Sequence, residues 1–270
     1  MLVHHPDSEH RLMAVMTVCF ADESEYHLTP STYVVSGLLG NAVEWYDLGI
    51  RWRRALKDKG LEAYGFHMSQ CENGSEPPYN RMERPERYAL QRTFIDIIQR
   101  SNLWGRATGI AQGRYNEADV KDAARAELGS VHKPYYFCFN HTIQWIANEV
   151  EEAGEFPREE RVAFIFDRQQ EYQGNAKALY DEVLTQHIEN KHRLGHLGFD
   201  ERMNAVQLQA ADVWAYESQR FLRATMLGET KCRWQFTRLA GDDSATSRYR
   251  VKFLSSDGVE TLARGRGWIP

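Results

Sequence analysis

The chain has 270 residues, of which 42% are hydrophobic and 26% are charged, and its net charge is −5 at pH 7. These values are typical of a globular protein with one large domain or a domain with an appendage, and no apolar run reaches the ~18 residues of a membrane span. The charge is uneven, because residues 220–270 carry ten Lys/Arg and five Asp/Glu, so this mildly basic region either faces solvent or contacts phosphates.

The N-terminus and the cysteines indicate a cytoplasmic protein. Residues 1–12 are polar and are expected to form a flexible extension, since a signal peptide needs a basic start and a small-residue cleavage site. The four cysteines are widely spaced and form no Cys-x-x-Cys pair, so we interpret them as reduced thiols.

The first elements read as a hairpin followed by a helix. The pattern predicts, in chain order, an apolar strand at residues 15–21, a polar turn at 24–31, a β-branched strand at 32–39, and a helix capped by Asn41 that extends to about residue 59. The two strands make an antiparallel hairpin.

Strands and helices alternate in the rest of the chain. The pattern predicts a short strand at 63–67, a loop at 69–84, a helix from Pro85 to about 101, a strand at 105–112, a helix from Pro134 to about 153, a strand at 161–166, a helix at 176–188, a strand at 194–199, a helix at 205–225, and strands at 233–239 and 248–254. The run at 161–166, RVAFIF, is continuously apolar, as strands of parallel sheets are.

A hairpin followed by alternating helices and strands predicts an α/β fold with a mixed sheet and helices on both faces. In such sheets, ligands bind beyond the carboxyl ends of the strands. The strands at 15–21 and 161–166 are each followed by an aspartate, Asp22 and Asp167. If these strands are parallel neighbours, the two carboxylates lie side by side at that edge.

Two neighbouring carboxylates favour a divalent cation or acid–base chemistry, because they repel each other unless a cation lies between them. Mg²⁺ and Mn²⁺ prefer oxygen ligands, and such ions activate water for attack on a phosphodiester. For Asp22, the acids of the stretch FADESE also allow a simpler interpretation as a hairpin turn. We interpret Asp22 as a strand-end ligand and the following acids as the turn.

A third carboxylate, Asp212, lies on the predicted helix at 205–225 and is flanked by alanines that let a helix approach a sheet closely. Gln209 and Tyr216 share its face of the helix. An acid on an apolar helix needs a partner. That partner is either a cation, shared with the other two aspartates, or a structural hydrogen bond or salt bridge.

The segments ADES, YVVSGLL, FHMS, VAFIFD and QLQAAD, in this order, resemble a bacterial and phage family, the one numbered 3800 among the domains of unknown function. The resemblance covers roughly residues 16–225. It implies a ribonuclease H-like fold and an acidic cluster, here Asp22, Asp167 and Asp212, of the kind found in metal-dependent nucleases. This chain has Glu25 where the family often has glycine, and Asp200 and Asn204 where it often has Asp-Ser.

Two further residues are secondary candidates for the site. Glu23 follows Asp22 and is either a metal-associated acid or a turn residue; strand alternation points it to the opposite face unless the strand has ended. His67 matches a strand-end histidine of the family and either contacts a phosphate and moves a proton or is a packed or surface residue.

The predicted organisation is a flexible extension at 1–12, a ribonuclease H-like domain at 13–225, and a C-terminal β appendage at 226–270. The predicted function is Mg²⁺- or Mn²⁺-dependent hydrolysis of phosphodiester bonds in DNA or RNA, through a three-aspartate site. Alternatives are a catalytically silent module that binds nucleic acid, a protein partner or a second copy, and a hydrolase of a small nucleotide, which the negative charge favours. No membrane partner is expected.

Overall fold

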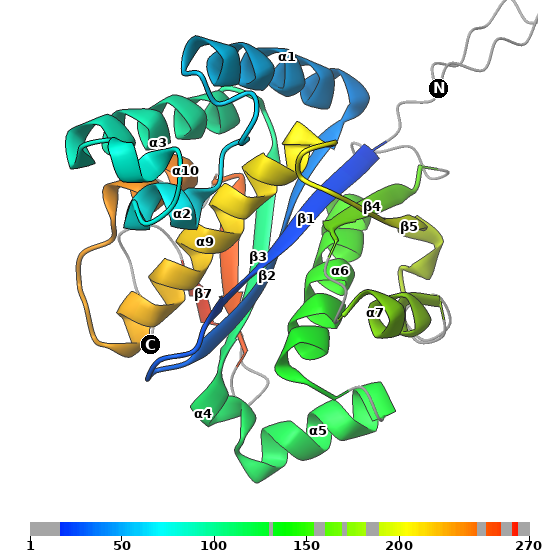
Figure 1. The fold of residues 1–270 in the computed structure, drawn as a ribbon. Coiled ribbons are helices and arrows are strands. Elements are labelled where there is room, and N and C mark those ends of the chain that lie inside the picture. Colours follow the sequence, from blue (N-terminus) through cyan, green and yellow to red (C-terminus); the bar gives the residue numbers. More distant parts are fainter. Residues whose placement is uncertain are drawn as a thin grey trace, which may run out of the picture.

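A central mixed sheet organises the structure, which is a computed structural model (Figure 1). It describes residues 17–129, 132–153, 160–168, 172–181, 189–241, 247–254 and 261–263. The strands are β1 (Thr17–Tyr26), β2 (Thr32–Asn41), β3 (Trp104–Ala111), β4 (Val162–Asp167), β5 (Leu194–Asp200), β6 (Tyr249–Phe253) and β7 (Thr261–Ala263). They lie in the order β5-β4-β1-β2-β3-β6-β7.

The middle of the sheet combines an antiparallel and a parallel part. β1, β2 and β3 are antiparallel neighbours in sequence order, whereas β4 and β5 run parallel to β1 on its other side. β6 runs parallel to β3, and β7 is antiparallel to β6. The predicted mixed α/β architecture, with an N-terminal hairpin and parallel strands, is therefore confirmed.

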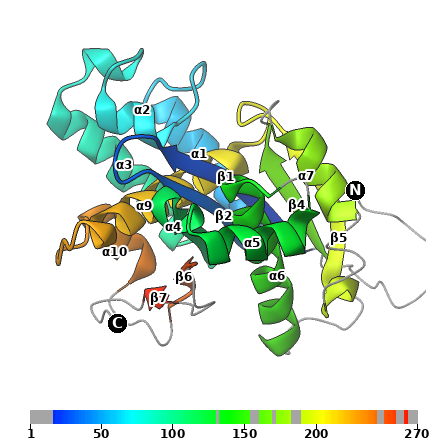
Figure 2. The same ribbon diagram turned by 90° about the horizontal axis from the view of Figure 1, so that it is seen from below.

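Helices cover both faces of the sheet (Figures 1 and 2). One layer, which shares a hydrophobic core with the sheet, contains α1 (Ala42–Asp58), α2 (Met68–Asn73), α3 (Arg84–Gln99), α9 (Val206–Met226) and α10 (Trp234–Ala240). The second core joins the opposite face to α5 (Ala118–Leu128), α6 (Pro134–Ala153) and α7 (Gln173–Leu179). Short helices lie at α4 (Gln112–Tyr115), η1 (Tyr79–Arg81) and η4 (Lys191–Arg193).

The helices that begin at strong local signals are confirmed. Asn41 caps α1 through a capping box, in which its side chain accepts hydrogen bonds from Val43 N and Glu44 N, while Glu44 accepts one from Asn41 N. Pro85 lies in the first turn of α3, and α6 begins at Pro134. Within the described residues, no helix is long and apolar enough to cross a membrane.

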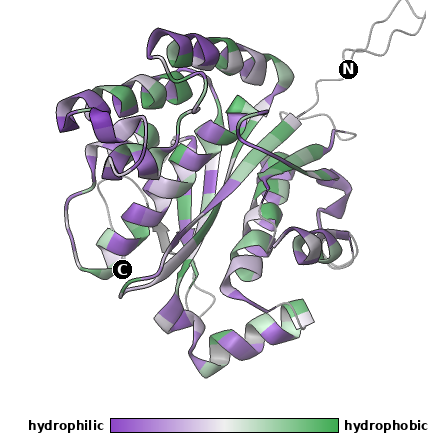
Figure 3. Ribbon diagram, viewed as in Figure 1, coloured by the Kyte–Doolittle hydropathy of each residue, from purple (hydrophilic) through white to green (hydrophobic). Residues whose placement is uncertain are grey.

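The predicted hairpin turn begins too early. β1 continues through the acidic stretch to Tyr26, so that Asp22 pairs with Ser36 and Glu23 with Val35 of β2. Figure 3 shows the change along β1 from a hydrophobic first part to a hydrophilic second part. Pairing with β2 on one side holds these acids in the strand, although acids are common in turns. Asp22 is therefore a strand residue, and the turn comes after Tyr26.

The short strand predicted at 63–67 is wrong. Gly65 has a φ of +67°, a left-handed conformation that interrupts a strand, and its N–H donates to Leu61 O at 2.8 Å. The loop predicted at 69–84 contains α2 and η1. His67 therefore stands immediately before a helix, and it does not end a strand.

The C-terminal prediction is corrected in two places. The strand predicted at 233–239 is the helix α10, whose Phe236 stacks on Phe221 of α9 with ring centroids 4.1 Å apart. The strand predicted at 248–254 is confirmed as β6, which extends the main sheet beside β3 and so is part of it, not an appendage. Helices α4 and α5 were not predicted. The extension at 1–12 and residues 182–188 of the helix predicted at 176–188 lie outside the described residues.

A buried polar network joins α2 and α9 through Arg233, which immediately precedes α10. Arg233 bridges Glu72, at 3.0 Å, and Glu217, at 3.3 Å. Glu217 has no exposed side-chain surface. Burial raises the pKa of Glu217 from 4.5 to about 7, against the opposing charge of Arg233. This carboxyl group therefore binds its proton more tightly in the folded protein than in the unfolded chain.

We expect Glu217 to make stability depend on pH. Because its folded pKa is raised, its stabilising contribution is full below about pH 4.5 and is lost as the pH rises to about 7. Relative to Glu217→Gln, the free energy of unfolding of the wild type should fall between pH 5 and pH 8 by on the order of 2 kcal/mol. Urea denaturation at several pH values measures this difference. Glu229→Gln, at an exposed position, is the control; parallel profiles for wild type and Glu217→Gln would contradict the expectation.

Candidate functional site

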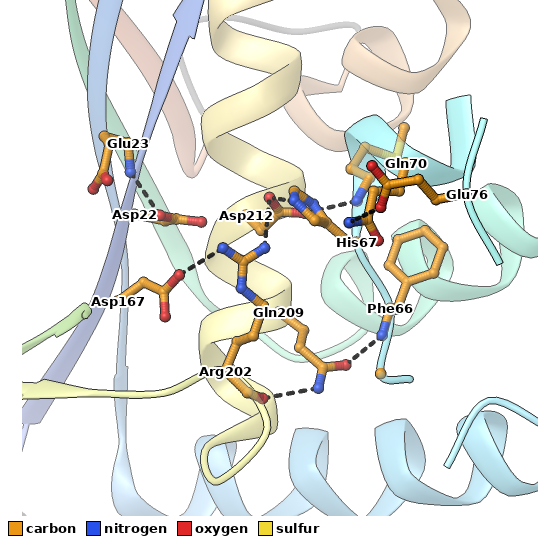
Figure 4. Close-up of polar contacts among 12 residues, drawn as sticks. Asp22, Glu23, Phe66, His67, Gln70, Glu76, Asp167, Arg202, Gln209 and Asp212 are labelled. Carbon is orange, nitrogen blue, oxygen red and sulfur yellow. Dashed lines mark hydrogen bonds and ion pairs between the residues drawn. The ribbon is translucent and has the colours of Figure 1, made fainter. Parts of the chain in front are cut away.

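Asp22 lies on the face of β1 that α9 covers, and its side chain points toward Asp212 (Figure 4). The residue is only 3% exposed. Its Oδ1 accepts a hydrogen bond from Glu23 N at 2.9 Å, and among the described residues no side chain donates to it. Burial raises the pKa of Asp22 well above its ordinary range; Glu23, Asp212 and Asp167 raise it further, and Arg202 lowers it.

Asp167 comes to the same place through the parallel pairing of β1 with β4. Ala21 pairs with Phe166, so the aspartates that follow them are neighbours across the two strands. Asp167 is 6% exposed, and its Oδ2 accepts a hydrogen bond from Arg202 Nη2 at 2.7 Å. The predicted juxtaposition of Asp22 and Asp167 is present.

Asp212 reaches the cluster from α9. Its neighbours Ala210 and Ala211 are fully buried, as expected for a helix that packs closely on β1 and β2. Its Oδ2 accepts a hydrogen bond from Met68 N at 2.7 Å, and its Oδ1 lies 2.9 Å from His67 Nδ1. Both carboxylate oxygens therefore have protein partners, which agrees with the structural interpretation of this residue.

His67 lies beside Asp212. Its side chain is 25% exposed, and its contact with Asp212 uses Nδ1. Among the described residues no hydrogen bond to Nε2 is found, so this nitrogen is available to a ligand. This contact has an ion-pair distance but not the geometry of a hydrogen bond, so it places a carboxylate beside Nδ1 without fixing the tautomer of the ring. The site interpretation of His67 therefore has geometric support.

The sequence did not indicate Arg202, which lies in the turn between β5 and α9. Its guanidinium pairs with Asp167 and lies 3.9 Å from Asp212 Oδ1 (Figure 4). Burial lowers the pKa of Arg202, but Asp22, Asp212 and Asp167 together raise it above its ordinary value. The sequence feature that could have identified Arg202 is its position as a basic residue just before the helix that carries Asp212.

Gln209 ties together the segments that surround Asp212. Its Oε1 accepts hydrogen bonds from Trp52 Nε1 at 2.9 Å and Phe66 N at 2.8 Å. Its Nε2 donates to Arg202 O at 2.9 Å, and Figure 4 shows the contacts with Phe66 and Arg202. Its side-chain amide thus links α1, the segment before His67 and the turn of Arg202 to α9. The sequence placed Gln209 on the face of Asp212 but did not show this role.

Glu23 does not join the three aspartates. Because β1 continues past it, strand alternation turns its side chain toward the opposite face, where it raises the pKa of Tyr135 on α6. Figure 4 shows Glu23 directed away from Asp212. Glu23 is neither a turn residue nor a member of the cluster.

The predicted three-aspartate metal centre stays a prediction. Within the part of the chain that the structure describes, no group of three or more His, Cys, Asp or Glu side chains is arranged to hold a metal ion. Among the described residues, Asp22 Oδ2 and Asp167 Oδ1 accept no hydrogen bond, whereas Asp167 Oδ2 is already bonded to Arg202. Mg²⁺ is commonly bound by one or two carboxylates together with waters and substrate phosphates, so these two residues fit a Mg²⁺ or Mn²⁺ ion that a phosphate completes.

Comparison with protein-family models finds no match to this chain, and comparison with curated proteins finds none either.

Proposed function

We propose that this protein hydrolyses phosphodiester bonds in nucleic acid with the help of a divalent cation, Mg²⁺ or Mn²⁺. The observation that carries the proposal is the convergence of Asp22, Asp167 and Asp212 on one buried spot, with Asp22 lacking a side-chain partner. Buried like charges are destabilising. Arg202 offsets part of this repulsion, and a divalent cation would offset the remainder.

The topology supports a ribonuclease H-like fold for this proposal. The strands β3-β2-β1-β4-β5 comprise an antiparallel three-stranded part followed by two strands parallel to β1. A ribonuclease H-like fold is expected to have this strand order, which supports the proposal, and here the acids on β1 and β4 lie side by side. It agrees with the family that the sequence resembles.

Asp22 and Asp167 are the residues that hold the cation in this proposal. When bound, the cation lowers the pKa of a water and stabilises charge on the phosphate. The carboxylate of Asp212 lies 2.9 Å from His67 Nδ1. Nε2 of His67 then exchanges a proton with the attacking water or the leaving oxygen. Since the cluster lies inside the fold, the reacting phosphate is partly shielded from water, which strengthens these charge interactions.

The test is a cleavage assay with the purified protein. Single- and double-stranded DNA and RNA, and a small diester, bis(p-nitrophenyl) phosphate, are incubated with Mn²⁺ or Mg²⁺. We expect cleavage that EDTA removes and added Mn²⁺ restores, and a rate about tenfold or more lower in Asp167→Asn, which loses one of the two proposed ligands. Asp58→Asn, an exposed residue of α1, is the charge-matched control and should cleave like the wild type.

Three results separate this proposal from its alternatives. Cleavage of the small diester without cleavage of polymers points to a nucleotide hydrolase, which the net charge of −5 favours. Cleavage that persists in EDTA overturns the proposed cation site. Cleavage by Asp167→Asn at the rate of the wild type overturns it as well.

The silent-module alternative also has an observation in its favour. Arg202 pairs with Asp167, and Asp212 accepts a hydrogen bond from Met68 N and lies 2.9 Å from His67 Nδ1, so two of the three acids already have partners within the protein. Salt-sensitive binding of nucleic acid without turnover, unchanged in Asp167→Asn, would support that module.

A further inference from the structure

We propose that Arg202 is an internal counter-ion whose guanidinium occupies the cation site until a divalent cation displaces it. In the cation-free protein, Arg202 neutralises the carboxylates that the cation needs, so that cation binding and the Arg202 ion pairs exclude each other. This inference rests on the proposed function, because it requires a divalent cation at Asp22 and Asp167.

The geometry places the guanidinium among all three aspartates (Figure 4). Nη2 lies 2.7 Å from Asp167 Oδ2, and Nη1 lies 3.9 Å from Asp212 Oδ1. Asp22 is the strongest of the charges that raise the pKa of Arg202, although it makes no ion pair with it. A single positive group is thus shared by three acids, and it contacts one of the two proposed cation ligands directly.

The environment of Asp22 is a separate observation, and it indicates that the site lacks a cationic group. It is 3% exposed and points into the cluster, and among the described residues its only hydrogen bond comes from the backbone N–H of Glu23. If all groups are ionised, one guanidinium leaves two of the three negative charges uncompensated. A divalent cation carries two positive charges and would compensate for both of them. Because Asp167 would be a ligand of this cation and also pairs with Arg202, the cation would lie close to the guanidinium.

Repulsion therefore makes the two cations competitors. A divalent ion bound to Asp167 at ~2.1 Å lies within a few ångströms of a guanidinium on the same carboxylate, and their repulsion is twice that of two unit charges. The Arg202 side chain is 29% exposed, so it has a route to solvent. Its backbone carbonyl stays bonded to Gln209, so only the side chain needs to move.

The experiment is a calorimetric titration of the full chain with Mn²⁺, in the wild type, Arg202→Gln and Arg168→Gln. Arg168 is the matched control, because it follows Asp167 directly but pairs with Glu201, at 3.1 Å, and contacts none of the three aspartates. We expect Arg202→Gln to bind Mn²⁺ at least about tenfold more tightly than the wild type does. Arg168→Gln should bind Mn²⁺ with the affinity of the wild type. Without metal, Arg202→Gln should melt at a lower temperature than the wild type, and Mn²⁺ should restore its melting temperature.

The outcomes distinguish this inference from the proposed function. Equal or weaker Mn²⁺ binding by Arg202→Gln, with wild-type binding intact, overturns the counter-ion and leaves the cation site standing. Absence of Mn²⁺ binding in both proteins overturns the cation site and, with it, this inference. If Arg202→Gln does not fold, the Arg202→Lys variant is titrated in its place. The lysine ammonium lacks the planar fork of arginine, so it should compete less with the divalent cation. Arg202→Lys should therefore bind Mn²⁺ more tightly than the wild type does. Unchanged binding in Arg202→Lys would then overturn the inference.

Discussion

Replacing Asp22 with asparagine is expected to abolish phosphodiester cleavage while stabilising the fold. Asp22 interacts electrostatically with both other aspartates, and we take it as the central ligand of the proposed site. Loss of a cation that supplies several kcal/mol of transition-state stabilisation lowers the rate by about 10³-fold. The asparagine Oδ1 can still accept the hydrogen bond from Glu23 N, so the local backbone is preserved.

The stability of Asp22→Asn should rise, although its cleavage activity falls. Asparagine removes a carboxylate that is 3% exposed and surrounded by other acids. In EDTA at pH 8, the free energy of unfolding should therefore rise by roughly 1–2 kcal/mol. Urea denaturation measures this change, and Asp58→Asn, at an exposed site, should leave both activity and stability unchanged. A destabilised Asp22→Asn would mean that the charge of Asp22 is already compensated in the fold.

Replacing Gln209 with methionine is expected to cause the largest loss of stability near the site. Methionine has a similar volume but no amide, so it leaves Trp52 Nε1, Phe66 N and Arg202 O without their buried partner. Each unpaired buried group costs about 1–3 kcal/mol. After partial relaxation we expect a total loss of about 3–5 kcal/mol, which is a large part of the stability of an ordinary domain.

Gln207→Met is the matched control for this variant. It makes the same chemical change on the same helix, at a half-buried position with no side-chain hydrogen bond among the described residues. We expect its stability to lie within about 0.5 kcal/mol of the wild type. Urea denaturation of both variants at one pH gives the comparison. Similar stabilities for Gln209→Met and Gln207→Met would show that water or a rearranged neighbour replaces the amide of Gln209.

Local signals account for the elements that were predicted correctly. The cap at Asn41 and the proline at 134 start helices through contacts within one turn, and the apolar run of β4 has the composition of a buried strand. Such features act over a few residues, so they can be recognised without knowledge of the fold.

The incorrect elements were those in which distant partners outweigh the local pattern. The stretch Asp22–Glu25 resembles a turn, but pairing with β2 holds it in a strand. Residues 233–239 have the alternating aromatics of a strand, but packing of Phe236 on Phe221 stabilises a helix. In both cases the decisive partner lies in another segment of the chain, so no window of local sequence contains it.

By itself, the sequence determined the mixed α/β class and the three aspartates, because strand ends and an acid on an apolar helix are local features. Only the tertiary structure decided what surrounds those acids: Arg202 between Asp167 and Asp212, His67 beside Asp212, and Glu23 turned to the other face. The physical reason is that ion pairs and hydrogen bonds act over a few ångströms in space. Arg202 and Asp167 are 35 residues apart, and His67 and Asp212 are farther still, so folding alone brings them together.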